Sequence, residues 1–204
     1  MVKRDIVVFG GSAGGIRATR DMLGELPEKV PAAIFLVRYT SVHSPGLLPD
    51  APATPGSPCV RYGKNGEAFE RSVVYVTPPD LHMLLEAQGC IRLAFGPKEH
   101  RFRPAVDPLF RSAALAFGSR VMGVVKAAGG LTVVQHPQEA EESSMPQSAL
   151  DHVAVDHCLP VRDIAGLLIR LSSGEGSLAE HAVRRQSSDH QEEPGPPGEH
   201  EEVS

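Results

Sequence analysis

The sequence has few cysteines and no excess of basic residues. Its three cysteines, Cys59, Cys90 and Cys158, are widely spaced and odd in number, so they indicate neither a disulfide framework nor a CxxC metal site. The formal net charge is −5 at pH 7, which leaves no basic face to neutralise phosphates. We therefore expect reduced thiols, no metal and no nucleic-acid partner.

Long hydrophobic runs are also missing. No apolar segment approaches the ~20 residues that a membrane-spanning helix needs. The first residues, MVKRDIVVFGG, lack the apolar stretch and cleavage site of a signal peptide. These absences predict a cytoplasmic protein without membrane insertion. The 204 residues are enough for one α/β domain with a sizeable core.

Apolar residues become rare from about Ser172, where the chain consists mainly of Ser, Glu, Gly, Pro and His. Such a segment cannot bury enough surface to offset the entropy lost on ordering. We expect one folded domain at 1–171 and a disordered acidic tail at 172–204. The histidines of the tail are irregularly spaced, which favours a solvated segment over a metal site.

The turn Gly10–Gly15 joins a predicted strand at Ile6–Phe9 to a predicted helix at Ile16–Leu26. Ser12 is the centre of a GxSxG pattern, which can expose a nucleophilic hydroxyl at the end of a strand. A structural turn and a serine that faces a phosphate are alternative interpretations. A dinucleotide-binding turn is disfavoured, because Ser12 and Ala13 occupy positions where GxGxxG needs glycine. We expect no cofactor.

The rest of the chain alternates predicted strands and helices, which indicates an α/β fold with a mostly parallel, doubly wound sheet flanked by helices in three layers. Residues 38–60 contain five prolines and predict an irregular loop. The helix at Asp107–Phe117 has Asp107 as its expected N-cap and Pro108 at its first position. The other expected elements are strands at 32–37, 73–76, 121–125 and 131–135, a hairpin turning at Gln88-Gly89, and helices at 145–151 and 161–171.

One junction conflicts with a parallel sheet. Only residues 126–130 separate the strands Val121–Val125 and Leu131–Gln135, whereas a parallel crossover normally needs a dozen or more residues. We therefore expect antiparallel neighbours, a displaced strand, or a deleted crossover helix.

Several segments, taken in order, are similar to one family. They are FGGSAGG, VYVTPPDLHMLLE, HRFRPAVDPLFRSAA and AAGGLTVVQHPQEA followed by SMPQSALDHVAVDHCLP. Together they resemble the catalytic domain of the CheB-type protein-glutamate methylesterases of bacterial chemotaxis, over about Ile6 to Leu171. The resemblance implies a doubly wound domain, a phosphorelay context, and methylated chemoreceptor helices as partners of a monomer. Many members carry a receiver domain before this domain, and we expect none here.

The family hydrolyses glutamyl methyl esters with a serine, a histidine and an aspartate. The resemblance places Ser12 on the nucleophile position, but it places the family's Gln-His pair on Arg38-Tyr39. Tyrosine, with a pKa near ~10, cannot replace imidazole as a base at neutral pH. His43 is the nearest candidate base. The loop that carries the family's aspartate is missing between Val125 and Lys126.

We therefore predict a methylesterase-like domain with impaired catalysis, Ser12 and His43 being its candidate catalytic residues. The alternative is a non-catalytic scaffold or a receptor-binding pseudoenzyme. The remaining signature residues can serve surface shape or substrate contact; these are Arg101, Arg103, Asp107 and Met145. Five further histidines are expected in loops or at the surface: His82, His100, His136, His152 and His157.

Overall fold

A computed structural model describes residues 3–11, 16–38, 56–123, 131–140, 143–152 and 154–174, without the side chains of residues 16–18 and 145. Seven strands form one sheet in the order β3-β4-β2-β1-β7-β8-β9, and all neighbouring pairs are parallel. The strands are β1 (Ile6–Gly11), β2 (Ala33–Arg38), β3 (Cys59–Tyr62), β4 (Val73–Val76), β7 (Val121–Gly123), β8 (Leu131–Gln135) and β9 (His157–Leu159). The predicted doubly wound α/β fold is confirmed.

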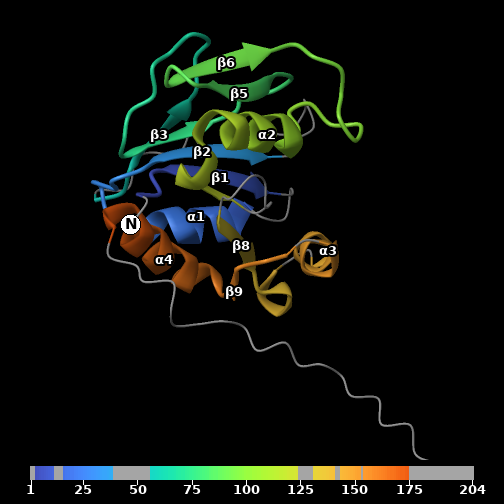
Figure 1. Ribbon diagram of the computed structural model, residues 1–204. Helices are drawn as coiled ribbons and strands as arrows, with labels where there is room; N and C mark the ends of the chain where they lie inside the picture. The colour runs from blue at the N-terminus through green and yellow to red at the C-terminus, as the bar shows by residue number, and fades with distance from the viewer. Residues whose placement is uncertain are drawn as a thin grey trace, which may run out of the picture.

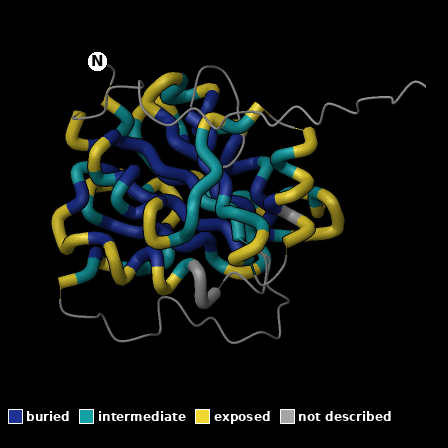
Figure 2. Tube along the Cα trace, turned by 90° about the horizontal axis from the view of Figure 1, so that it is seen from below, coloured by how far each residue is buried: buried dark blue, intermediate teal, exposed yellow. Residues whose placement is uncertain are grey.

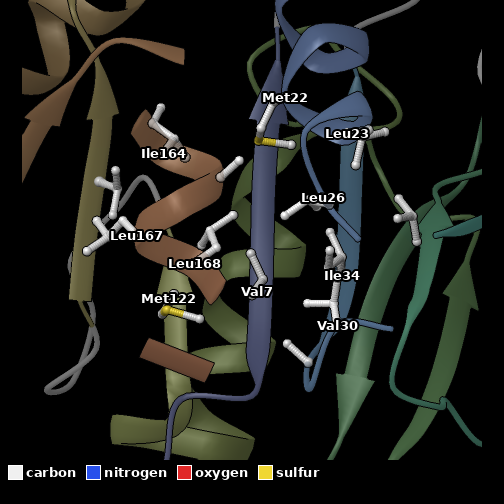
Figure 3. Packing of buried hydrophobic residues seen from close by; sticks show 14 of the residues in the cluster. Val7, Met22, Leu23, Leu26, Val30, Ile34, Met122, Ile164, Leu167 and Leu168 are labelled. Atoms are coloured by element: carbon white, nitrogen blue, oxygen red, sulfur yellow. The ribbon is translucent and has the colours of Figure 1, made fainter. Parts of the chain in front are cut away.

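The helices α1 (Ile16–Gly24) and α4 (Val161–Ser173) cover one face of this sheet (Figure 1). Alternate residues of the strands point to this face, because side-chain direction alternates along a strand. Val7, Ile34 and Met122 pack there against Leu26 of the segment after α1 and Leu168 of α4, as Figure 3 shows. This cluster takes side chains from β1, β2, β4, β7 and β8 and buries this face of the sheet.

The opposite face is covered by α2 (Val106–Phe117) and by the antiparallel hairpin of β5 (His82–Glu86) and β6 (Cys90–Ala94). Phe35 of β2 lies between two aromatic rings there. It stacks on Tyr75 at 5.4 Å and meets the edge of Phe69 at 5.0 Å between ring centroids. Figure 2 shows the buried segments running through the interior, with exposed residues at the periphery.

Two short 3₁₀ helices, Gly118–Arg120 and Pro137–Glu139, and α3 (Ser144–His152) complete the described elements. The predicted hairpin is confirmed, with Gly89 at φ +84° in its turn. In the described segments, no helix is both long enough and apolar enough to cross a membrane. The thiols of Cys59, Cys90 and Cys158 are free.

Three expectations about element bounds were wrong. Helix α2 begins at Val106 after Ala105, and Asp107 makes no capping bond, because its carboxylate is engaged by His100. Strand β3 begins at Cys59, directly after the last proline, so it takes in the last two residues of the expected loop, and it lies at the edge of the sheet, where neighbouring prolines are tolerated. Helix α4 continues to Ser173, and Ser172 is buried with its hydroxyl bonded to the Ile169 carbonyl.

At the junction after β7, the strands β7 and β8 are parallel neighbours, which excludes the antiparallel alternative and agrees with the deletion of a crossover helix. Among the described residues, two pairs connect them, Met122 with Leu131 and Gly123 with Thr132. The seven residues between the two strands are fewer than a parallel crossover normally needs. Residues 124–130 lie outside the described residues.

Candidate functional site at the carboxyl edge of the sheet

The last residues of β1 and β2 lie side by side, because Gly11 is the register partner of Arg38. Ligands of parallel α/β sheets bind at this carboxyl edge. The predicted catalytic residues Ser12 and His43 follow these two strands, and both lie outside the described residues, as does Tyr39. The structure therefore describes the strand ends that precede Ser12 and His43. The catalytic roles of these two residues remain predictions.

The first turn of α2 packs against the end of β1. A Cβ atom placed on Gly10 would lie only 2.7 Å from Val106 Cγ2, much closer than real Cβ contacts. Glycine is therefore needed at position 10 so that α2 can approach the turn that leads to Ser12. This contact brings the N-terminus of α2, which is the positive end of the helix dipole, next to Gly10 at the end of β1.

The segment between β6 and α2 is clamped by Arg103. Its Nε donates to Asp80 Oδ1 at 2.8 Å and its Nη1 donates to the Gly96 carbonyl at 2.8 Å. The guanidinium also lies 3.6 Å from the ring centroid of Phe95. Arg103 is almost buried, with 12% of its side chain exposed. The sequence left open whether Arg103 shapes the surface or contacts a substrate. These contacts within the protein support the first role.

His82 of β5 holds the same segment, between β6 and α2, by hydrogen bonds to its backbone. The Ala105 N–H donates to its Nδ1 at 3.2 Å, which leaves the proton on Nε2, and Nε2 donates to the Pro97 carbonyl at 2.9 Å. His82 is 3% exposed and belongs to β5. The expectation of a loop or surface histidine was wrong here, because both ring nitrogens have backbone partners that make burial acceptable.

His100 and Arg101 form the exposed tip of this segment. Both have left-handed backbone conformations, with φ +50° and +71°. His100 Nε2 lies 3.0 Å from Asp107 Oδ2, with 77% and 38% of the two side chains exposed. This segment and the first turn of α2 thus carry an imidazole, a carboxylate and a guanidinium, and the first residue of α2, Val106, packs on Gly10 of β1.

Arg38 contributes a second positive charge to this edge, from the α1 face. It is 8% exposed, and its Nη1 is buried without a hydrogen-bond partner. Burial lowers the pKa of Arg38 below its ordinary value, Tyr62 counteracts this, and the like charge of Arg20 adds to it. Residue patterns did not predict this burial, because arginine is usually exposed.

The other expected histidines lie away from the ends of β1 and β2. His136 follows the end of β8 and precedes a 3₁₀ helix, and His157 is the first residue of β9; both are half-buried. His152 ends α3 and is exposed. Met145 belongs to α3, but its side chain lies outside the described part. Within the described ranges, no three His, Cys, Asp or Glu side chains cluster in a way that could hold a metal ion.

A groove of about 570 Å³ is lined by residues of the hairpin and of α2, which also touch directly where the Leu85 N–H donates to Ser112 Oγ. It is mostly apolar and is lined by Leu84, Ala94, Pro108, Ser112 and Leu115, with Glu99 and Arg111 at its margin. A hydrogen bond from Arg111 at 2.7 Å lowers the pKa of Glu99. Sequence patterns did not predict this groove, because it depends on how the hairpin sits over the helix.

The fold and the signature segments agree with one family profile, described as CheB methylesterase, which matches residues 7–125 and 118–168. The chain belongs to the CheB methylesterase family. The match is in two segments that meet at 118–125, beside the short junction after β7.

Similar proteins agree with this assignment. A putative protein-glutamate methylesterase/protein-glutamine glutaminase of Leptospira interrogans serogroup Icterohaemorrhagiae serovar copenhageni is 31% identical over 182 residues, covering 82% of this chain and 94% of that protein. Protein-glutamate methylesterase/protein-glutamine glutaminase 2 of Rhizobium johnstonii is 34% identical over 78% of this chain, but the match covers 48% of that longer protein.

The crystal structure of the Thermotoga maritima CheB methylesterase catalytic domain has the same fold. It superposes with a TM-score of 0.69 at 25% identity and covers 83% of this chain and 100% of that domain. The sheet, the flanking helices and the order of strands described above are therefore those of a CheB methylesterase catalytic domain.

Proposed function

We propose that this chain is a cytoplasmic, monomeric CheB-family domain that binds the methylated helices of a chemoreceptor-like protein and hydrolyses their glutamyl methyl esters slowly or not at all. The observation that carries this proposal is Arg38, a buried cation at the strand end where the resemblance expects the neutral residue before the catalytic histidine. The position that follows Arg38, which the resemblance assigns to the base, holds Tyr39, and a phenol cannot accept the proton of a serine at neutral pH.

The reaction needs a base at that place. Ser12 Oγ would attack the ester carbonyl carbon while a base removes its proton, methanol would leave, and water would then cleave the acyl-serine to the free glutamate. In triad hydrolases, loss of the acid alone costs ~10⁴ in kcat and loss of the base ~10⁶. In this chain the resemblance assigns the base position to Tyr39 and finds no segment for the acid after Val125.

The recognition surface is better supported than the catalytic one. Arg103, Asp80 and His82 hold the segment 96–105 by hydrogen bonds, and Arg101 is exposed at its tip. Arg38 lies at the carboxyl edge of the sheet. Glutamate-rich receptor helices suit such a cationic edge, since complementary charge steers association and fixes orientation.

The test measures acylation and binding on the same full-length chain. We expect a serine-directed fluorophosphonate to label the wild type no faster than Ser12→Ala. We also expect a soluble chemoreceptor fragment to bind the wild type and to bind Arg101→Gln more weakly. Arg4→Gln removes the same charge at the opposite edge and serves as the control. Fast labelling that Ser12→Ala abolishes, or absence of receptor binding, would contradict the proposal.

One observation favours the alternative, an active esterase. His100 and Asp107 already form an imidazole–carboxylate pair at 3.0 Å, at the end of α2 that packs on Gly10. Such a pair is the base and orienting acid that a serine nucleophile needs. In that case Ser12-dependent acylation would disappear in His100→Ala and survive in His43→Ala, and the opposite result would assign the base to His43.

A further inference from the structure

Arg38 lies in the layer between the sheet and α1. Its neighbours at positions 34 and 36 of β2 belong to the core cluster on the α1 face, and alternation along the strand places Arg38 on that face too. Arg20 on α1 and Tyr62 at the end of β3 are the groups whose charges act on it. The guanidinium is thus enclosed at the carboxyl edge by three elements, β2, α1 and β3.

No carboxylate in the described part of the chain forms an ion pair with Arg38, and its Nη1 makes no hydrogen bond there. A buried charge without a counter-ion is strongly unfavourable, and buried arginines are normally paired. The other well-buried arginine of this edge, Arg103, has both Asp80 and a carbonyl as partners. Arg38 Nη1 is therefore a buried donor for which the described structure supplies no acceptor.

We infer that Arg38 is a carboxylate-binding site and that the sheet edge binds the free γ-carboxylate of glutamate in preference to its methyl ester. The guanidinium presents parallel N–H groups that match two carboxylate oxygens, whereas a methyl ester has no charge and one good acceptor oxygen. This inference rests on the proposed receptor-binding function. With this preference, the domain would bind receptor helices whose glutamates are demethylated more tightly than methylated ones.

The probes are N-acetyl-L-glutamate N′-methylamide and its γ-methyl ester, titrated into the full-length chain by NMR. A charge-assisted hydrogen bond is worth ~1.5–3 kcal/mol, so we expect the carboxylate to bind roughly tenfold or more tightly than the ester. Arg38→Met should abolish this preference and Arg38→Lys should weaken it. Arg4→Met, with the same change in charge at the opposite edge, should retain it.

A stability measurement distinguishes this site from a merely structural arginine. Without ligand, Arg38→Met should unfold at the same or a higher urea concentration than the wild type, because it removes an uncompensated buried charge. Added carboxylate should raise the midpoint of the wild type only. A variant that unfolds earlier, together with equal binding of carboxylate and ester by the wild type, would overturn the inference.

The carboxylate could also come from the acidic segment 175–204 of this chain. A full-length variant with Glu192, Glu193, Glu199, Glu201 and Glu202 replaced by glutamine tests that source. Tighter probe binding by this variant means that the segment competes for Arg38, and unchanged binding means that the site takes a partner's glutamate. Failure of the probes to bind leaves the acylation and receptor-binding tests of the proposed function unaffected, so the two can fail separately.

Discussion

Val106 packs directly against Gly10, so that the first turn of α2 and the end of β1 share one contact. Any side chain at position 10 would collide with Val106 Cγ1 and Cγ2 at 2.8 and 2.7 Å. The end of β1 can therefore pack this closely against α2 only because residue 10 has no Cβ atom. The consequence can be measured with a single substitution.

Gly10→Ala should lower the free energy of unfolding by about 1–3 kcal/mol, because overpacking forces α2 or β1 to shift. The measurement is urea denaturation at pH 7. Gly24→Ala is the matched control, since a Cβ at position 24 meets nothing within 4 Å. That control should be neutral or slightly stabilising, because alanine favours a helix. Equal effects of the two substitutions would show that Val106 yields without cost.

Asp5 links the amino end of the sheet to two arginines. It is 4% exposed and accepts hydrogen bonds from Arg120 at 2.8 Å and Arg71 at 2.9 Å. Burial by itself raises the pKa of Asp5, but the bonds and charges of Arg120 and Arg71 outweigh it and bring the pKa below its ordinary value. The stabilisation is therefore fully present above the unfolded pKa of ~3.9 and is lost as pH falls through the folded value.

Asp5→Asn should cost about 2–4 kcal/mol at pH 7, where the ion pairs are complete. Its free energy of unfolding should also fall less steeply than that of the wild type as pH decreases below about 4. Denaturation curves at several pH values measure both effects. Asp21→Asn, at an exposed position of α1, should leave the slope unchanged. A slope that is the same in all three proteins would refute the role of Asp5.

His82→Phe keeps the ring's bulk but removes both of its hydrogen bonds. We expect a loss of about 1–3 kcal/mol, because the Ala105 N–H and the Pro97 carbonyl lose their partner. Residues 96–105 should also be cleaved faster by protease, since His82 ties both ends of that segment to β5. His152→Ala, at an exposed helix end, is the control. Unchanged cleavage would show that Arg103 alone holds the segment.

Leu168→Ala should cost about 2–5 kcal/mol, because it leaves a cavity between α4 and the sheet. Leu168 is 2% exposed and packs in the cluster of Figure 3. Leu115→Ala makes the same chemical change where 87% of the side chain is exposed, and it should alter stability by less than ~0.5 kcal/mol. If Leu115→Ala lowered the free energy of unfolding as much as Leu168→Ala, the exposed side of α2 would have to be buried in a further interface.

Much of the fold could be predicted from residue patterns. The apolar runs at Ile6–Phe9 and 32–37 lie in β1 and β2, and Gln88-Gly89 turns the hairpin, because local propensity and burial agree in these segments. The motifs also identified the family through their order along the chain. The short strands β3 and β9 were not predicted, since three or four residues carry too little periodicity to reveal a strand.

Sequence by itself determined the family, the α/β class and the motif-based candidates Ser12 and His43, because these depend on residue types and their order. Tertiary structure alone decided that β7 and β8 are parallel neighbours, that His82 is a buried tie, and that Arg38 is enclosed without an anion. Each of these features depends on contacts between segments that are far apart in the sequence. Burial, strand pairing and hydrogen-bond partners arise from such contacts, so no local residue pattern encodes them.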